Sequence, residues 1–157
     1  MTIKASFHGN TLTISQTYAA PRSAVFEAWI ETSQVEQWWG CAQTTAVRSQ
    51  IEPRVGGAYN HHMTIDNAGE FPALSKFVEF DPPKRLAYVT LSPDGDGEMK
   101  VTVDFIETDT GTRVELQHEG IPTDTAAPLP PNMPEIIQAG WTAALGKLED
   151  FLLKRAA

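Results

Sequence analysis

Histidine and cysteine side chains are the groups of this 157-residue chain that could transfer protons or bind a metal ion near neutral pH. His61 and His62 are adjacent, whereas Cys41 and His118 are isolated in the sequence. Neighbouring side chains on a strand point to opposite faces, so His61 and His62 cannot both ligate one metal ion. Cys41 has no identifiable activating histidine, and no Cys/His spacing resembles a zinc site. The sequence therefore predicts no metal site.

His118 is the strongest candidate for proton transfer, because it follows Leu116 at the end of an apolar stripe on one strand face. An inward-facing histidine at that position can hydrogen-bond a ligand or act as an acid or base. The alternative is a histidine that is satisfied by a neighbouring backbone group. His61 has the same two interpretations, since it shares a strand face with Tyr59 and Met63.

Aromatic side chains supply the candidate walls of a ligand site. Tyr88 combines an apolar ring with a polar tip, which suits the orientation of a ligand, although a core would use the same residue. The tryptophans could line a pocket for an aromatic or isoprenoid molecule, or fill the core. The candidate ligand-binding residues are Trp38, Trp39, Tyr59, His61, Met63, Tyr88, Phe105, His118 and Trp141.

Other motifs indicate no cofactor. The acidic segment 94–98 resembles a calcium loop, but Val103 stands where that loop needs a glutamate, so we interpret the segment as a hairpin turn. Gly56 and Gly57 are not followed by a helix, as a dinucleotide fingerprint requires. No serine lies in a nucleophile elbow. We therefore expect no bound cofactor, and the sequence contains no evident catalytic constellation.

The elements that must position these side chains begin with a strand over residues 11–18, where apolar and polar residues alternate. A proline in the first turn and apolar residues at helical spacing predict a helix over 21–30. A second short helix follows, with Thr32 or Ser33 as its N-cap and Glu36 completing a capping box.

Short strands separated by turn residues come next. Their hairpin-length connections predict an antiparallel meander. The expected strands are residues 44–52, 58–65, 74–80, 85–91, 98–107 and 112–118.

The last part of the chain contains a proline-rich loop over 121–134, long enough to act as a lid, and then a long helix that Asn132 can cap. About 24 residues at 1.5 Å each give a rod of roughly 36 Å. A curved sheet must cover its apolar face, and this helix has the required length. We therefore predict a single α+β domain over 1–157, in which about seven antiparallel strands curve around the C-terminal helix.

Five blocks of sequence, in the correct order, resemble one known family. They are residues 20–29 with 35–39, 54–59, 80–86, 111–118 and 140–152. These blocks are similar to the activator of heat-shock protein 90 ATPase homologue-like family, within the START/SRPBCC (Bet v 1-like) superfamily. The resemblance covers about residues 11–153 and implies the helix-grip fold.

Three functional hypotheses follow from the residues and the resemblance. The first is binding of a small hydrophobic or aromatic molecule in a cavity between the sheet and the C-terminal helix. The second is a cyclase or dehydratase that uses the same cavity, with His118 as acid or base; His118→Ala would then abolish turnover and preserve ligand affinity. The third is stress-related regulation of a chaperone ATPase, although the chain matches only the carboxy-terminal module of the eukaryotic co-chaperone. The family also makes a homodimer plausible.

Charge and composition argue against several classes of partner. The chain has 12 Lys and Arg against 20 Asp and Glu, a net charge of -8, which disfavours nucleic acid and anionic membrane surfaces. It has no apolar run of the roughly 18 residues that a membrane span needs, and no signal-peptide pattern at its amino terminus. With its single cysteine, the sequence predicts a cytoplasmic protein without membrane or nucleic-acid partners.

Overall fold

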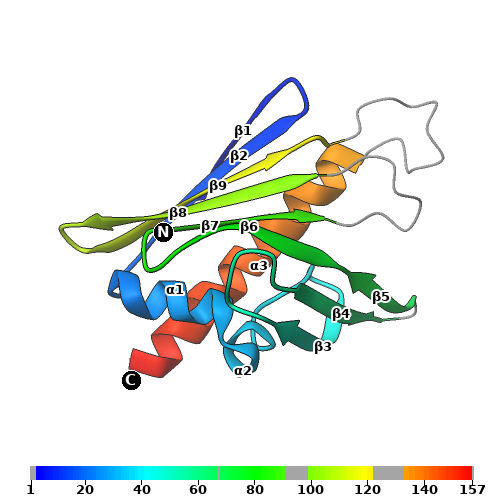
Figure 1. Ribbon diagram of the computed structural model, residues 1–157, viewed down its shortest axis with the longest axis horizontal. Coiled ribbons are helices and arrows are strands. Elements are labelled where there is room, and N and C mark those ends of the chain that lie inside the picture. Colours follow the sequence, from blue (N-terminus) through cyan, green and yellow to red (C-terminus); the bar gives the residue numbers. More distant parts are fainter. Residues whose placement is uncertain (1–2, 67, 91–98, 122–132, 157) are drawn as a thin grey trace.

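The computed structural model describes residues 3–66, 68–90, 99–121 and 133–156. Within these ranges the chain forms two antiparallel sheets and three helices (Figure 1). In chain order the elements are β1 (Lys4–His8), β2 (Thr11–Tyr18), α1 (Arg22–Ile30), α2 (Thr32–Val35), β3 (Thr44–Ile51), β4 (Tyr59–Ile65), β5 (Gly69–Ala73), β6 (Ser75–Asp81), β7 (Arg85–Thr90), β8 (Lys100–Thr108), β9 (Gly111–Glu119) and α3 (Met133–Ala156).

The larger sheet has six strands in the order β1-β2-β9-β8-β7-β6. Its strands follow the expected alternation, because every second residue of β2 and of β9 is buried. In β2 the buried positions include Leu12 and Ile14, and in β9 they include Leu116 and His118. The register places Leu12 opposite His118, so the apolar faces of the two strands form one continuous surface.

The smaller sheet has the order β3-β4-β5 and is joined to the larger one by a bridge between Ala58 and Lys76. The chain passes from the smaller sheet to the larger at Leu74, between β5 and β6. The sequence predicted one meander of about seven strands. The structure instead divides nine described strands between two sheets, because the chain changes sheet at this point and adds β1 and β5.

The helix α3 lies along one face of the six-stranded sheet (Figure 1). Its buried residues recur at helical spacing: Trp141, Ala144, Leu145, Leu148 and Leu152. Together with the inward residues of the sheet and with α1, they form the main core. The α+β helix-grip architecture predicted from the sequence is confirmed.

The short helix α2 begins differently from the prediction. Neither Thr32 nor Ser33 is its N-cap; Glu31 takes that position and makes no side-chain cap hydrogen bond. The Glu36 carboxylate instead accepts a hydrogen bond from the backbone N–H of Ser49, at 2.8 Å. The carboxylate that the capping box would have used therefore joins the end of α2 to strand β3.

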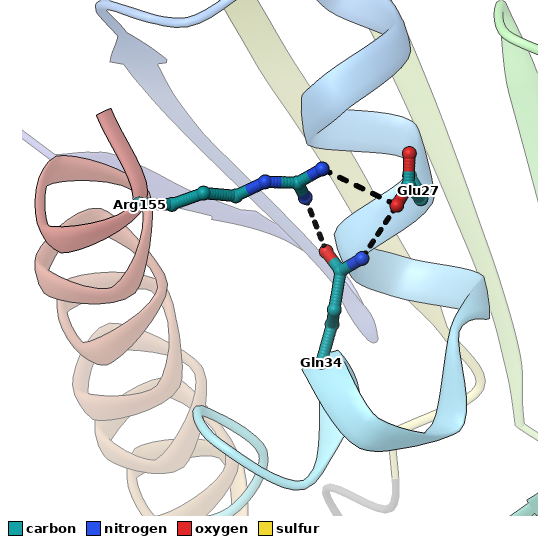
Figure 2. Close-up of polar contacts among 3 residues, drawn as sticks. All are labelled: Glu27, Gln34 and Arg155. Atoms are coloured by element: carbon teal, nitrogen blue, oxygen red, sulfur yellow. Dashed lines mark hydrogen bonds and ion pairs between the residues drawn. The ribbon is translucent and has the colours of Figure 1, made fainter. Parts of the chain in front are cut away.

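A polar cluster joins the C-terminal end of α3 to the two short helices (Figure 2). The Arg155 guanidinium donates to Gln34 Oε1 at 2.7 Å and to Glu27 Oε1 at 3.3 Å. Gln34 Nε2 also donates to Glu27, at 2.6 Å. The cluster connects the three helices. Because its side chains are partly exposed, it contributes little to stability.

Three predictions lie largely or wholly outside the described residues: the lid over 121–134, the N-cap at Asn132 and the turn at 94–98. Among the residues that are described, no helix is both long and apolar enough to cross a membrane.

Candidate functional site

A pocket of about 300 Å³ opens between the N-terminal half of α3, strand β4 and the turn that follows α2. Its lining residues are almost entirely apolar and none carries a formal charge at neutral pH. They are Trp39, Gly40, Cys41, Met63, Ile65, His118, Ile136, Ile137, Gly140, Trp141 and Ala144. The volume is at the lower end of the range for small-molecule sites, roughly 300–1,000 Å³.

Helix α3 supplies nearly half of the lining and also shapes the space. Gly140 lies on the pocket side of the helix, and a Cβ atom built on it would meet no atom within 4 Å. Glycine at this position therefore leaves room that any larger residue would occupy. On the opposite wall, alternation along β4 directs Met63 and Ile65 toward the same space, as the strand pattern predicted.

His118 is held by two neighbours at the inner end of the pocket. Trp141 Nε1 donates to His118 Nδ1 at 2.9 Å, and His118 Nε2 lies 3.2 Å from Met99 Sδ. Because Nδ1 accepts the tryptophan hydrogen bond, the neutral ring carries its proton on Nε2. Burial lowers the pKa of His118 to about 4. The ring is therefore a neutral hydrogen-bonded part of the wall at pH 7.

Trp39 covers His61. The two rings stack with centroids 3.9 Å apart and planes at 26°. His61 is 1% exposed and does not line the pocket, whereas Trp39 does. Ser49 Oγ lies 2.8 Å from His61 Nδ1, and His61 Nε2 has no hydrogen-bond partner among the described residues. Burial, and secondarily the charge of His62, lowers the pKa of His61 to about 3.

The other candidates lie in the core. Tyr59 donates from its hydroxyl to the carbonyl of Trp29 at 2.8 Å, and Trp38 Nε1 donates to the carbonyl of Ala28 at 2.9 Å. Burial raises the pKa of Tyr88. Phe105 packs edge to face against Phe26.

Of the nine candidate ligand-binding residues, the structure therefore brings four together around the pocket: Trp39, Met63, His118 and Trp141. A binding role for any of the nine stays a prediction. The other five are buried; among them Trp38 and Tyr59 donate to backbone carbonyls, and His61 lies behind the Trp39 ring.

Lys147 contacts the turn after α2 that carries Cys41, one of the pocket-lining residues. Lys147 Nζ, from α3, donates to the carbonyl oxygens of Cys41 at 3.1 Å and Trp39 at 3.4 Å. Burial alone would raise the pKa of the Cys41 thiol, but hydrogen bonds from Thr44 and backbone amides, with the Lys147 charge, lower it overall. Burial lowers the pKa of Lys147. The lysine thus fixes the position of the Trp39 wall relative to α3.

Sequence reasoning did not nominate several lining residues. Gly40, Gly140 and Ile136 gave no chemical signal, because their contribution is the space or surface they leave. Ile137 and Ala144 recur at helical spacing with the buried residues of α3, and Cys41 was considered only for reactivity and metal binding. A search for glycines within the buried stripe of the helix would have found Gly140.

Comparisons with known proteins agree with this fold. The sequence profile of the family described as "Activator of Hsp90 ATPase homolog 1-like protein" matches residues 19–152. No functionally curated protein matches the chain.

Solved structures of bacterial proteins superpose closely on it. A crystal structure from Chromobacterium violaceum has 24% identity and a TM-score of 0.78, over 91% of this chain and 96% of that one. A crystal structure from Rhodobacter sphaeroides has 17% identity and a TM-score of 0.81, over 98% and 99%. An AHSA1-like protein from Aeromonas hydrophila, solved by NMR, has 23% identity and a TM-score of 0.72, over 93% and 94%.

These identities are below 25%, so the solved structures show a shared fold and nothing of shared chemistry. The profile match is the stronger finding, because it extends from residue 19, just before α1, to residue 152 within α3 and contains every pocket-lining residue. The chain belongs to the Activator of Hsp90 ATPase homolog 1-like family.

Proposed function

We propose that this protein binds a small, uncharged hydrophobic or aromatic molecule in the pocket between α3, β4 and the turn after α2. The observation that carries the proposal is the lining itself, an apolar concave surface of about 300 Å³ with two tryptophan rings and no charged side chain. Burial of apolar ligand surface there contributes roughly 25 cal/mol per Å². A carboxylate or ammonium group would lose its hydration and find no opposite charge.

The state of His118 supports binding rather than acid–base catalysis at this site. A general acid must hold an exchangeable proton near the working pH, and burial lowers the pKa of His118 to about 4. Its Nδ1 lone pair is already engaged by Trp141. The predictions of cyclase or dehydratase activity, and of chaperone regulation, stay predictions.

The test is equilibrium dialysis of the purified protein against 2-methylnaphthalene, an uncharged bicyclic hydrocarbon. We expect saturable binding of one equivalent to the wild-type protein. The variant Gly140→Leu should weaken this binding about tenfold or more, because the new side chain occupies pocket volume that the ligand needs. In a well-packed space even one added methylene group is destabilising. Leucine is also a better helix former than glycine, so the variant should fold.

The matched control is Gly146→Leu. Gly146 lies on the same helix, its Cβ would also meet no atom within 4 Å, and it does not line the pocket. This control should bind the hydrocarbon as the wild type does. Equal loss of binding in both variants, or non-saturable uptake by the wild type, would contradict the proposal.

A further inference from the structure

We propose that the pocket has an inner position behind Trp39, where His61 hydrogen-bonds the hydroxyl group of an aromatic alcohol. The proposal rests on the binding function proposed above and adds the polar group that the preferred ligand carries. It requires the Trp39 ring to move off His61 when such a ligand enters.

The first observation is a buried polar atom without a partner. His61 Nε2 is inaccessible to solvent and makes no hydrogen bond within the described part of the chain. The other ring nitrogen, Nδ1, is paired with Ser49 Oγ at 2.8 Å. A buried polar group left without a partner destabilises the folded state, so a ligand atom that pairs with Nε2 recovers that cost.

The second observation is the position of Trp39. Its ring lines the pocket on one side and stacks on His61, at 3.9 Å between centroids, on another. Trp39 is only partly buried, unlike Trp38 and Trp29, which are 0% exposed. It follows α2 and precedes Gly40, whose φ is 102°. Trp39 is therefore the side chain whose displacement would connect the pocket to His61.

The chemistry around Trp39 favours a neutral hydroxyl group. Burial keeps the His61 ring uncharged at pH 7, so it offers no charge to a carboxylate. Trp29, whose ring lies edge to face with Trp39 at 6.4 Å, has a buried Nε1 donor that also lacks a partner among the residues described. A hydroxyl group both donates and accepts, so it can pair with either tautomer of His61 and can accept from a tryptophan N–H.

His118 is the rival polar contact, because it lines the pocket directly. Both of its ring nitrogens already have neighbours, Trp141 Nε1 at Nδ1 and Met99 Sδ at Nε2. A ligand hydroxyl group would have to replace one of these contacts. At His61 it would supply a missing contact instead.

The test compares two probes of matched shape, 2-naphthol and 2-methylnaphthalene, which differ in a hydroxyl group against a methyl group. The measured quantity is the ratio of their dissociation constants, obtained by equilibrium dialysis. We expect His61→Leu to reduce the relative preference for 2-naphthol about fivefold, the equivalent of one hydrogen bond. The control His62→Leu, on the opposite face of β4, should leave the ratio unchanged.

A second measurement uses the wild-type protein, so that it does not depend on the folding of a variant. The chain has four histidines, and their ring nitrogens can be followed by ¹⁵N NMR. We expect the His61 Nε2 resonance to shift with 2-naphthol and not with 2-methylnaphthalene. A hydroxyl-dependent shift at His118 in place of His61 would overturn the inference.

The two proposals fail in different ways. If neither probe binds the wild-type protein, the proposed function is wrong and the inner position has no ligand to hold. If both probes bind, but their ratio is the same in wild type and His61→Leu and no His61 resonance responds to 2-naphthol, the pocket binds aromatic molecules without using His61.

Discussion

Two imidazoles buried in their neutral form give the protein a defined response to acid. Burial lowers the pKa of His118 to about 4 and that of His61 to about 3, from an ordinary value of 6.5. Below pH 6.5 the unfolded chain binds protons at these positions and the folded chain does not, so unfolding takes up protons. These two groups therefore leave the free energy of unfolding unchanged above pH 6.5. They lower it as the pH falls from there toward 4.

We expect the free energy of unfolding, measured by urea denaturation, to fall between pH 7 and pH 4. Each pKa unit of difference between the folded and unfolded states corresponds to about 1.4 kcal/mol. His61→Leu should make this decline shallower, because one depressed pKa is removed. His62→Leu should change the slope less, because the charge of His62 is only the secondary cause of the lowered His61 pKa. A wild-type and a His61→Leu curve that run parallel through this range would show that His61 does not titrate as its burial implies.

At the scale of elements, one lysine couples the long helix to the pocket rim. Lys147 of α3 holds two carbonyl oxygens of the turn after α2, those of Trp39 and Cys41. The wall that Trp39 forms is thus attached to the helix that forms the facing wall.

We expect Lys147→Met to cost about 1 kcal/mol of stability, the net value of a hydrogen bond, and to weaken the binding of 2-methylnaphthalene. Methionine keeps the length of the apolar stem and removes the ammonium group. The control is Lys154→Met on the same helix, which removes the same charge from an exposed side chain. If both variants lose the same stability in urea unfolding and the same affinity in dialysis, the loss comes from the change in overall charge. It would then not come from the hydrogen bonds of Lys147 to the turn.

The elements that sequence reasoning missed are those without a buried face. All five residues of β1 are exposed, so Lys4–His8 shows no alternation, and the strand forms by pairing with β2 at a sheet edge. In β5, Pro72 argues against a strand, yet β5 is an edge strand, where proline is tolerated. The strands with a buried face were predicted within two residues at each end, and β2 was predicted with the bounds it has, because burial imposes a period on the sequence.

At the scale of the whole molecule, the pocket lies beside the main core and is not its centre. Leu145, Leu148 and Leu152 pack into the core, Ile136 and Gly140 border the pocket, and the residues between them, such as Trp141 and Ala144, do both. One helix therefore stabilises the fold with one half of its length and shapes the site with the other. The site can be altered at Gly140 without removing core contacts.

Ligand binding should consequently add to the stability of the whole fold. At a free 2-methylnaphthalene concentration ten times the dissociation constant, the free energy of unfolding should rise by about 1.4 kcal/mol in the wild type. Because Gly140→Leu is expected to bind at least about tenfold more weakly, it should gain about 0.4 kcal/mol or less at that concentration. Urea unfolding followed by circular dichroism measures both values, and an equal gain in the two proteins would place the ligand outside this pocket.

The candidate site was predictable in part. Strand alternation predicted which side chains of β4 and β9 face inward. Two of these, Met63 and His118, line the pocket. Alternation does not tell whether an inward residue meets open space or another side chain. Tyr59 and His61 share the face of Met63, yet Trp39 lies over His61 and the Tyr59 hydroxyl serves a backbone carbonyl. That distinction depends on the packing of side chains from distant elements, which no local pattern contains.

The aromatic packing also gives the protein an optical property. All four tryptophans of the chain belong to one cluster, in which Trp29 stacks on Trp141 at 6.0 Å and Trp39 contacts both rings. Indoles this close exchange excitation energy, so light absorbed by any of them is emitted from the cluster as a whole. Two of the four line the pocket. The ultraviolet emission of the unlabelled protein is therefore an intrinsic reporter of whatever enters there.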